Sequence, residues 1–304
     1  MKKRLLITLL AVLIVLSGVG ILLYPIISNR QFQKSQQKLI KYYENQMQES
    51  PKEERDTMWD ECRKYNESLL KSKVVLTDPF EEDSQNLEEH PYIDLLNING
   101  DGIMCSLEIP AINCYLVVYH YTDKDVLAKG VGHLQGTSLP VGGEGTHAVL
   151  SGHTGTADKE LFTNLDQVRE GDVFYIHVLG ETLAYKVDQK QVVLPDETES
   201  LYIDREKDYV TLVTCTPYGI NSHRLLVRGT RIPYEEAKII EKKMGKTKKS
   251  TWKNQYFYAV LVGVSLSVVV ILIMVKVDKK MIQKRKLKVK EKTKEKEKTK
   301  EKVT

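Results

Sequence analysis

Hydrophobic positions divide the chain into two long uncharged runs and a middle region of shorter, patterned segments. The first run covers residues 5–27 and the second covers residues 257–275. About 20 apolar helical residues, at 1.5 Å each, cross the hydrocarbon layer of a bilayer. We therefore expect two transmembrane helices. A cleaved signal peptide is the alternative for the first run, but its apolar stretch usually has only about 7–15 residues.

Basic residues flank both runs and indicate their orientation. Lys2, Lys3 and Arg4 precede the first run, and residues 276–304 hold 14 basic and 5 acidic residues. Because positive charge favours the cytoplasmic side, we expect both ends inside the cell and residues 29–253 outside. The net charge of +4 hides this asymmetry: the ends carry +3 and +9, and the part between them carries −8. An acidic body argues against a nucleic-acid partner, which requires a basic face.

Residues 29–76 are polar, with apolar side chains at helical spacing. These side chains are Leu39, Tyr42, Tyr43 and Met47, followed by Met58, Trp59, Cys62, Tyr65 and Leu69. The tetrapeptide 50–53, Ser-Pro-Lys-Glu, predicts a helix start with Ser50 as the N-cap. We expect two helices whose apolar faces pack against a domain; a plain stalk is the alternative.

Short β-rich runs separated by Gly, Pro, Asp and Asn follow from residue 101 to residue 234 and indicate a sandwich or a barrel. The predicted strands are Met104–Ile109, Ala111–Tyr119, His147–Ser151, Val173–Val178, Leu183–Val193, Tyr209–Cys215 and Arg224–Ile232. A short helix at Asp123–Lys129 and a turn near Leu161–Val168 are expected between them. Residues 235–255 are expected to form a helix or a tether.

Three of these strands carry reactive side chains at their ends. Cys215 ends one β-branched strand, His153 follows another after a glycine, and Arg224 opens a third. Together they suit acyl transfer: a thiolate as nucleophile, an imidazole as proton donor to the leaving amine, and a guanidinium on the oxyanion. A lone strand cysteine, however, is more often a small buried hydrophobe.

Other residues compete for these roles. Cys62, Cys105 and Cys114 lie in apolar stripes or strands and are interpreted as packing residues, with a Cys105–Cys114 bridge left open. His223 is a rival base, but strand neighbours point to opposite faces, so His223 faces away if Arg224 faces the site. The remaining histidines lack the spacing of metal ligands, and we expect no metal and no other cofactor.

The segment 211–215, Thr-Leu-Val-Thr-Cys, resembles the TLxTC signature of the sortases, the cysteine transpeptidases of Gram-positive cell surfaces. Ser151-Gly152-His153 and Arg224 then match the positions of that family's catalytic His and Arg. Residues 137–143 and 218–229 resemble the corresponding segments of the class C, or pilus-building, sortases, and the resemblance covers about residues 23–234.

The resemblance implies a mainly β fold: a closed eight-stranded sortase-type barrel with N-terminal helices, flanked here by the two expected transmembrane helices. It implies cleavage of an LPXTG-like sorting signal between Thr and Gly through a thioacyl intermediate on Cys215, which a pilin Lys resolves. It also implies that Asp78-Pro79-Phe80 is a lid, with Asp78 paired to Arg224 and Phe80 over Cys215. Pilin subunits and membrane lipid are the implied partners.

These expectations divide the chain into seven parts. They are a cytoplasmic stub and anchor (1–28), a helical segment (29–76), the lid and a connecting loop (77–100), the barrel (101–234), a tether (235–255), the second span (256–275) and a basic cytoplasmic tail (276–304). A housekeeping sortase that anchors proteins to peptidoglycan, a surface cysteine protease and a non-enzymatic scaffold are the competing functions.

Overall fold

The computed structural model describes residues 2–72, 74–81, 92–156 and 158–244, and residues 258–287 with gaps. Residues 24–250 form one compact unit, and the two ends of the chain, 1–23 and 251–304, form another. The unit of residues 24–250 holds the barrel and all the predicted site residues.

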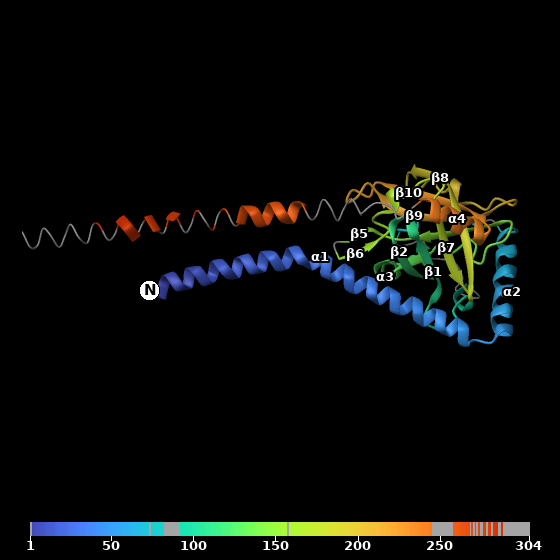
Figure 1. Ribbon diagram of the computed structural model, residues 1–304. Coiled ribbons are helices and arrows are strands. Elements are labelled where there is room, and N and C mark those ends of the chain that lie inside the picture. The colour runs from blue at the N-terminus through green and yellow to red at the C-terminus, as the bar shows by residue number, and fades with distance from the viewer. Residues whose placement is uncertain are drawn as a thin grey trace, which may run out of the picture. The chain divides into compact units, whose positions relative to one another are not determined.

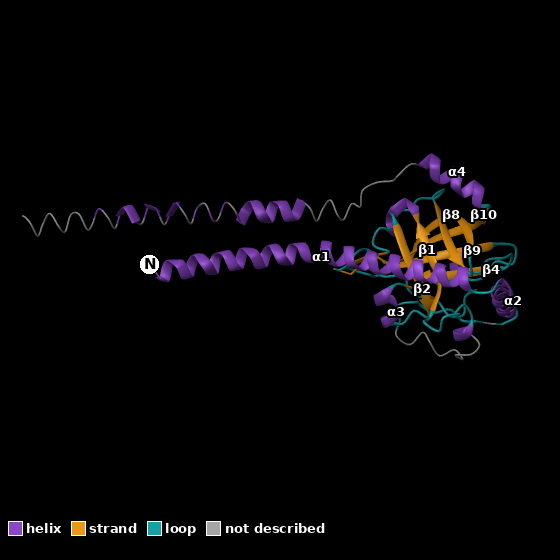
Figure 2. Ribbon diagram, turned by 60° about the horizontal axis from the view of Figure 1, so that its bottom comes forward, coloured by secondary structure: helices purple, strands orange, loops and turns teal. Residues whose placement is uncertain are grey.

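Eight strands close into a barrel in the order β1-β2-β3-β4-β9-β10-β8-β7, as the sequence resemblance implied (Figures 1 and 2). They are β1 (Ile103–Ile109), β2 (Cys114–His120), β3 (Val131–His133), β4 (Thr146–Ser151), β7 (Val173–Val178), β8 (Glu181–Val193), β9 (Asp208–Thr216) and β10 (His223–Ile232). The pairs β2–β3 and β4–β9 are parallel. A separate two-stranded sheet contains β5 (Thr154–Thr156) and β6 (Lys159–Leu161).

The seven predicted strands are confirmed, with their ends moved by a few residues. The second begins at Cys114 instead of Ala111, because Pro110–Ile112 forms the 3-10 turn η2 and Asn113 adopts a left-handed φ of 52°. Strand β3 was missed because three residues are too few to show an alternating pattern. Strands β4 and β9 are buried along almost their whole length, so they show little alternation either.

Two helices pack against the outside of the barrel, and the predicted docking of their apolar faces is confirmed. They are α1 (Lys2–Glu49) and α2 (Lys52–Leu69). Tyr43, Met47 and Cys62 are at most 3% exposed and belong to the main core. The Tyr43 hydroxyl donates to the Met104 carbonyl at 3.1 Å and accepts the Leu179 amide at 3.0 Å, which joins α1 to the barrel.

The predicted N-cap of the second helix is wrong. Helix α2 begins at Lys52 with Pro51 in the cap position, where no side chain caps the helix. The Ser50 hydroxyl instead donates to the Gln46 carbonyl at 2.8 Å, and the Ser50 amide donates to the same carbonyl at 2.8 Å, so Ser50 continues the end of α1. The connection between the helices is short, and the hydrogen bonds of Ser50 go to α1 and not to α2.

The remaining helical elements within residues 24–250 are short. They are α3 (Lys124–Lys129), α4 (Tyr234–Met244) and the 3-10 turns η1 (Tyr92–Asp94), η3 (Leu165–Gln167) and η4 (Glu199–Leu201). The Asp123 side chain caps α3 by accepting the Val126 amide, and Ala237 of α4 is fully buried with strands β7 and β8. The predicted helix or tether at 235–255 is thus a helix as far as Met244.

Some predictions fall outside the described residues. These are the acidic connection at 82–91, the end of the tether at 245–255 and most of the tail beyond 287. Within the described part of the chain, no helix combines the length and the apolar character needed to cross a membrane. The structure therefore gives no support to the two spans predicted at 5–27 and 257–275.

Candidate active site

The ends of β9 and β10 bring Cys215 and Arg224 together. The strands pair antiparallel, and Cys215 lies directly opposite Arg224 in the register. Side chains of directly opposite residues share one face of the sheet. The two residues are nine positions apart in the sequence, and the loop 217–222 connects their strands. The thiol and the guanidinium therefore lie side by side at one end of the barrel.

His153 reaches the same end of the barrel from β4, which pairs in parallel with β9. The Gly152 amide donates to the Val213 carbonyl at 3.0 Å, and the Thr154 hydroxyl donates to the Cys215 carbonyl at 2.7 Å. Hydrogen bonds on both sides of His153 thus fix its backbone to the strand that carries Cys215. Position 152 requires glycine, because a Cβ there would lie 2.8 Å from the Phe162 ring.

Asp78 and Phe80 cover this end of the barrel. The Arg224 Nε donates to Asp78 Oδ1 at 2.8 Å and a terminal nitrogen donates to Oδ2 at 2.5 Å, so the pair is bidentate. The Phe80 ring lies 5.1 Å from the Arg224 guanidinium carbon and 5.7 Å from the His153 ring. Asp78 is buried, at 4% exposure. An ion pair shielded in this way is stronger than one in water.

We call residues 74–81 the lid segment. From Val74 to Asp78 its buried positions alternate: Leu76 and Asp78 are buried and Val74 is half-buried, whereas Val75 and Thr77 are exposed. Pro79, the next residue, is buried as well. Leu76 enters an apolar cluster on the barrel, formed by Leu134, Val149, Leu201, Val213 and Leu226. This contact was not predicted, because the residues at 74–78, Val-Val-Leu-Thr-Asp, show no alternation of apolar and polar side chains in the sequence.

The charges at the site favour neutral forms of both reactive groups. Burial raises the pKa of the Cys215 thiol, the positive charge of Arg224 lowers it, and the negative charge of Asp78 raises it, with a net rise. Burial and the charge of Lys159 lower the pKa of His153. With the lid segment in place, a thiol and a neutral imidazole are therefore favoured over a thiolate and an imidazolium.

The other three cysteines are packing residues, as predicted. Cys62, Cys105 and Cys114 are buried, and burial is the main cause that raises the pKa of each thiol, for Cys62 to about 12. All the cysteines are free, so the Cys105–Cys114 bridge that the sequence left open is not formed. In the register of β1 and β2, Cys105 lies opposite Val118, and Cys114 lies opposite Ile109.

The remaining histidines in the described ranges have structural contacts. His223 lies opposite Thr216, and its Nδ1 contacts the Ser222 hydroxyl at 2.9 Å. His133 contacts the Tyr92 hydroxyl at 2.8 Å, and His147 contacts the Thr211 hydroxyl at 2.7 Å. Burial lowers the pKa of both His133 and His147 to about 4, which keeps them neutral.

Comparison with known proteins identifies the family. The sortase domain model matches residues 107–232. Sortase D of Bacillus subtilis is 32% identical over 129 residues, which cover 41% of this chain and 62% of that protein. The chain thus spans less than two thirds of this curated relative. Sortase A of Bacillus anthracis is 26% identical over 149 residues, which cover 48% of this chain and 69% of that protein.

Solved structures give a closer match. Sortase C of Streptococcus pneumoniae, described as informative on catalysis and pilin substrate specificity, is 43% identical with a TM-score of 0.61, covering 65% of this chain and 97% of that one. Sortase C-1 of Actinomyces oris is 46% identical with a TM-score of 0.56, covering 60% and 99%. A pilus-related sortase C of Group B Streptococcus is 41% identical with a TM-score of 0.59, covering 64% and 96%. The chain therefore belongs to the sortase family of cysteine transpeptidases, in its class C branch.

Proposed function

We propose that this protein cleaves an LPXTG-like sorting signal between Thr and Gly and joins the acyl part to a Lys amine of another pilin subunit. The observation that carries the proposal is the pairing of Cys215 with Arg224 across β9 and β10, with the backbone of His153 hydrogen-bonded beside them. The names of the solved relatives, which mention pili and pilin, support a pilin substrate.

The reaction has two steps, with defined roles for three side chains. In the first, His153 takes the proton of the Cys215 thiol, the resulting thiolate attacks the Thr carbonyl carbon, and the Arg224 guanidinium stabilises the oxyanion. His153 then gives that proton to the Gly amine as the peptide C–N bond breaks. In the second, the Lys amine attacks the thioacyl carbon, loses a proton to His153 and displaces the Cys215 sulfur. The products are an isopeptide bond and the regenerated thiol.

The lid segment determines when this site can act. Two nitrogens of Arg224, Nε and one terminal nitrogen, donate to the Asp78 carboxylate. While these hydrogen bonds hold, the same two nitrogens cannot donate to an oxyanion. Phe80 lies close to both His153 and Arg224, so a substrate must displace it. The free enzyme is therefore autoinhibited, and binding of a substrate or partner opens the lid.

Sortases are surface enzymes of Gram-positive bacteria, and we place the barrel of this chain outside the cell. A housekeeping role on peptidoglycan is the second candidate, but the bidentate lid contact and the class C relatives favour pilus assembly. A surface protease would use the same thioacyl step and then react with water.

One experiment separates these functions. The full chain is incubated with an LPXTG-like peptide, a Lys-containing pilin peptide and a peptidoglycan stem peptide that carries an amine, and the products are resolved by mass spectrometry. The proposal expects a ligated isopeptide, which Cys215→Ala abolishes. Hydrolysis alone, unaffected by the Lys donor, would identify a protease, and ligation to peptidoglycan amines in preference to pilin Lys would identify the housekeeping role.

A further inference from the structure

Strand β4 ends with a buried hydroxyl that has no hydrogen-bond partner in the described part of the chain. Ser151 is 0% exposed, and neither a side chain nor a backbone group pairs with its Oγ. A polar group that is taken out of water and left unpaired destabilises a fold. Because most buried polar side-chain atoms in native proteins have a partner, an exception calls for a reason other than stability.

The side chain of Ser151 lies on the face of the sheet that the lid segment covers. Successive side chains of a strand alternate between its two faces. Ala148 and Leu150 of β4 belong to the main core, whereas Val149 belongs to the apolar cluster that receives Leu76. Ser151, two residues after Val149, therefore shares the face of that cluster.

The strand register brings Ser151 close to the nucleophile. Ser151 of β4 lies opposite Val213 of β9, and Val213 stands two residues before Cys215. Val213 belongs to the same apolar cluster as Val149, so the side chains of Ser151, Val213 and Cys215 share one face. Along the strand direction, Ser151 is thus about 7 Å from the level of Cys215.

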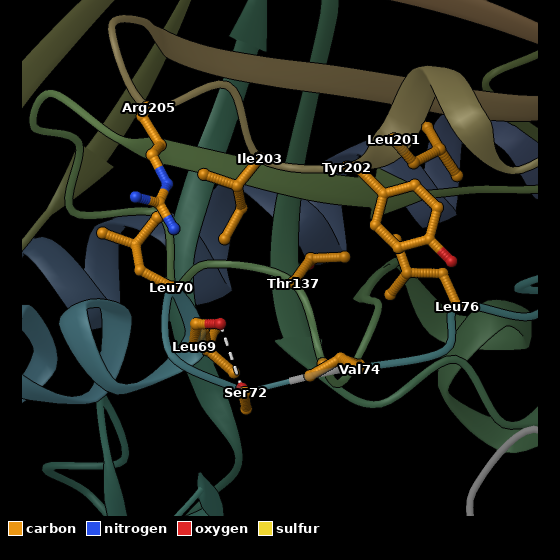
Figure 3. Close-up of a pocket in the computed structure, with 11 residues that line it drawn as sticks. Leu69, Leu70, Ser72, Val74, Leu76, Thr137, Leu201, Tyr202, Ile203 and Arg205 are labelled. Carbon is orange, nitrogen blue, oxygen red and sulfur yellow. Dashed lines mark hydrogen bonds between the residues drawn. The ribbon is translucent and has the colours of Figure 1, made fainter.

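The lid segment passes over this stretch of β4. Leu76 packs in the cluster with Val149, and the Phe80 ring lies 5.7 Å from the His153 ring. Ser151 stands between Val149 and His153 in the chain, below the middle of the segment. Figure 3 shows how the start of the segment lies along the barrel, where its side chains line a small hollow together with those of the β8–β9 connection.

A bound substrate has to replace the lid segment on this face. Asp78 holds two donors of Arg224, so the segment must leave before a substrate carbonyl can reach them. A peptide in its place brings backbone N–H and C=O groups over Ser151, whose hydroxyl can accept from the first or donate to the second. This pairing does not depend on the direction of the peptide, because every residue carries at least a C=O group.

We propose that Ser151 is a substrate-binding residue whose hydroxyl forms a hydrogen bond with the backbone of the sorting signal close to the scissile bond. The hydroxyl is unpaired below the lid segment and paired in the complex, so it favours the substrate over the lid. This inference rests on the proposed function and adds a contact to the same site.

The test measures both activity and stability of Ser151→Ala in the full chain. Loss of one hydrogen bond to the substrate should lower kcat/KM for thioacyl formation about tenfold. Most of the change should be a higher KM, because the bond is made to a part of the substrate that does not react. The midpoint of urea unfolding should stay the same or rise, because the hydroxyl loses no partner within the fold.

Ser106→Ala is the matched control. Ser106 is 1% exposed, and its Oγ also lacks a partner among the described residues. It lies on β1, which is four strands from β9 in either direction around the barrel. The substitution should give the same response to urea as Ser151→Ala, and kcat/KM should be unchanged.

A second comparison changes the substrate and uses the unsubstituted enzyme as its reference. One backbone amide of the peptide at a time is replaced by an ester, which removes the N–H group and weakens the carbonyl as an acceptor. At one position near the scissile bond, the unsubstituted enzyme should lose about tenfold in kcat/KM, whereas Ser151→Ala should lose nothing further. Equal losses in the two enzymes at every position would overturn the inference.

Failure of this inference can be told from failure of the proposed function. If the amide peptide forms no thioacyl adduct with the unsubstituted enzyme, the proposed function is wrong and the inference fails with it. The inference alone is overturned if the adduct forms equally fast in Ser151→Ala, if Ser106→Ala slows it as much, or if Ser151→Ala unfolds at a clearly lower urea concentration.

Discussion

A single carboxylate, Asp78, connects the lid to the chemistry of Cys215. Its charge contributes to the raised pKa of the thiol, and it holds two donors of Arg224 that would otherwise be free to bind an oxyanion. In the proposed mechanism, the same residue therefore restrains both the nucleophile and the group that stabilises the transition state.

Asp78→Ala should lower the pKa of Cys215 and speed its alkylation. Removing the negative charge stabilises the thiolate, so the rate against pH shifts to lower pH. The measurement is the iodoacetamide reaction rate of Cys215 across a pH series. Asp188→Ala is the control, because Asp188 forms a bidentate pair with Arg228 of β10 outside the lid contact. An unshifted profile in Asp78→Ala would contradict the restraint.

Arg224→Lys tests whether the planar guanidinium is needed as well as its charge. Lysine keeps the charge but cannot make the bidentate contact with Asp78. We expect a loss in kcat of about 100-fold or more, as for loss of an oxyanion donor, with thioacyl formation followed by mass spectrometry. Activity within about threefold of the unsubstituted enzyme would exclude the oxyanion role.

At the scale of elements, the N-terminal helices act as a brace for the barrel. Tyr43 of α1 joins the Met104 carbonyl of β1 to the Leu179 amide after β7 through one hydroxyl. Without that hydroxyl, a buried donor and a buried acceptor lose their partner.

Tyr43→Phe should therefore destabilise the domain by about 1–3 kcal/mol without changing the residues of the site. Urea unfolding measures the loss, and thioacyl formation should keep its rate. Tyr42→Phe is the matched control, because Tyr42 on the same helix is 46% exposed. Equal stability of the two variants would show that the contact does not brace the barrel.

Sequence reasoning predicted the strands that have clear β-branched patterns and both helices of residues 29–76. It missed β3, which has three residues, and it assigned Ser50 to the wrong helix, because a Ser-Pro start signal does not reveal that α1 ends immediately before it. Cys215, His153 and Arg224 were proposed because each stands at a strand end and because the segments around them resemble the sortase signature. The contact of Leu76 with the apolar cluster depends on residues up to 150 positions away and could not be read locally.

At the scale of the whole molecule, buried neutral histidines tie stability to pH. Burial lowers the pKa of His133 and His147 to about 4 from the usual histidine value of about 6.5. Between about pH 4 and pH 6.5 the unfolded chain binds protons at these residues, whereas the folded chain does not. The free energy of unfolding therefore rises with pH across this range.

The free energy of unfolding should therefore fall as pH drops from about 6.5 to 4. Urea unfolding at a series of pH values measures the slope. His147→Gln should flatten it, since Gln does not titrate, whereas His223→Gln is a control on the partly exposed β10 position. A slope that is unchanged in His147→Gln would contradict the assignment.

Formation of a thioacyl adduct on Cys215 is the step of the proposed reaction that can be observed most directly. The full chain is mixed with an LPXTG-like peptide without an amine donor, and its mass is measured intact and after digestion. The account predicts a mass increase equal to the acyl part of the peptide, located on Cys215. The fraction of protein that carries this adduct should rise in Asp78→Ala, and the adduct should be absent in Cys215→Ala. An adduct that persists in Cys215→Ala, or peptide cleavage without any adduct on Cys215, would contradict it.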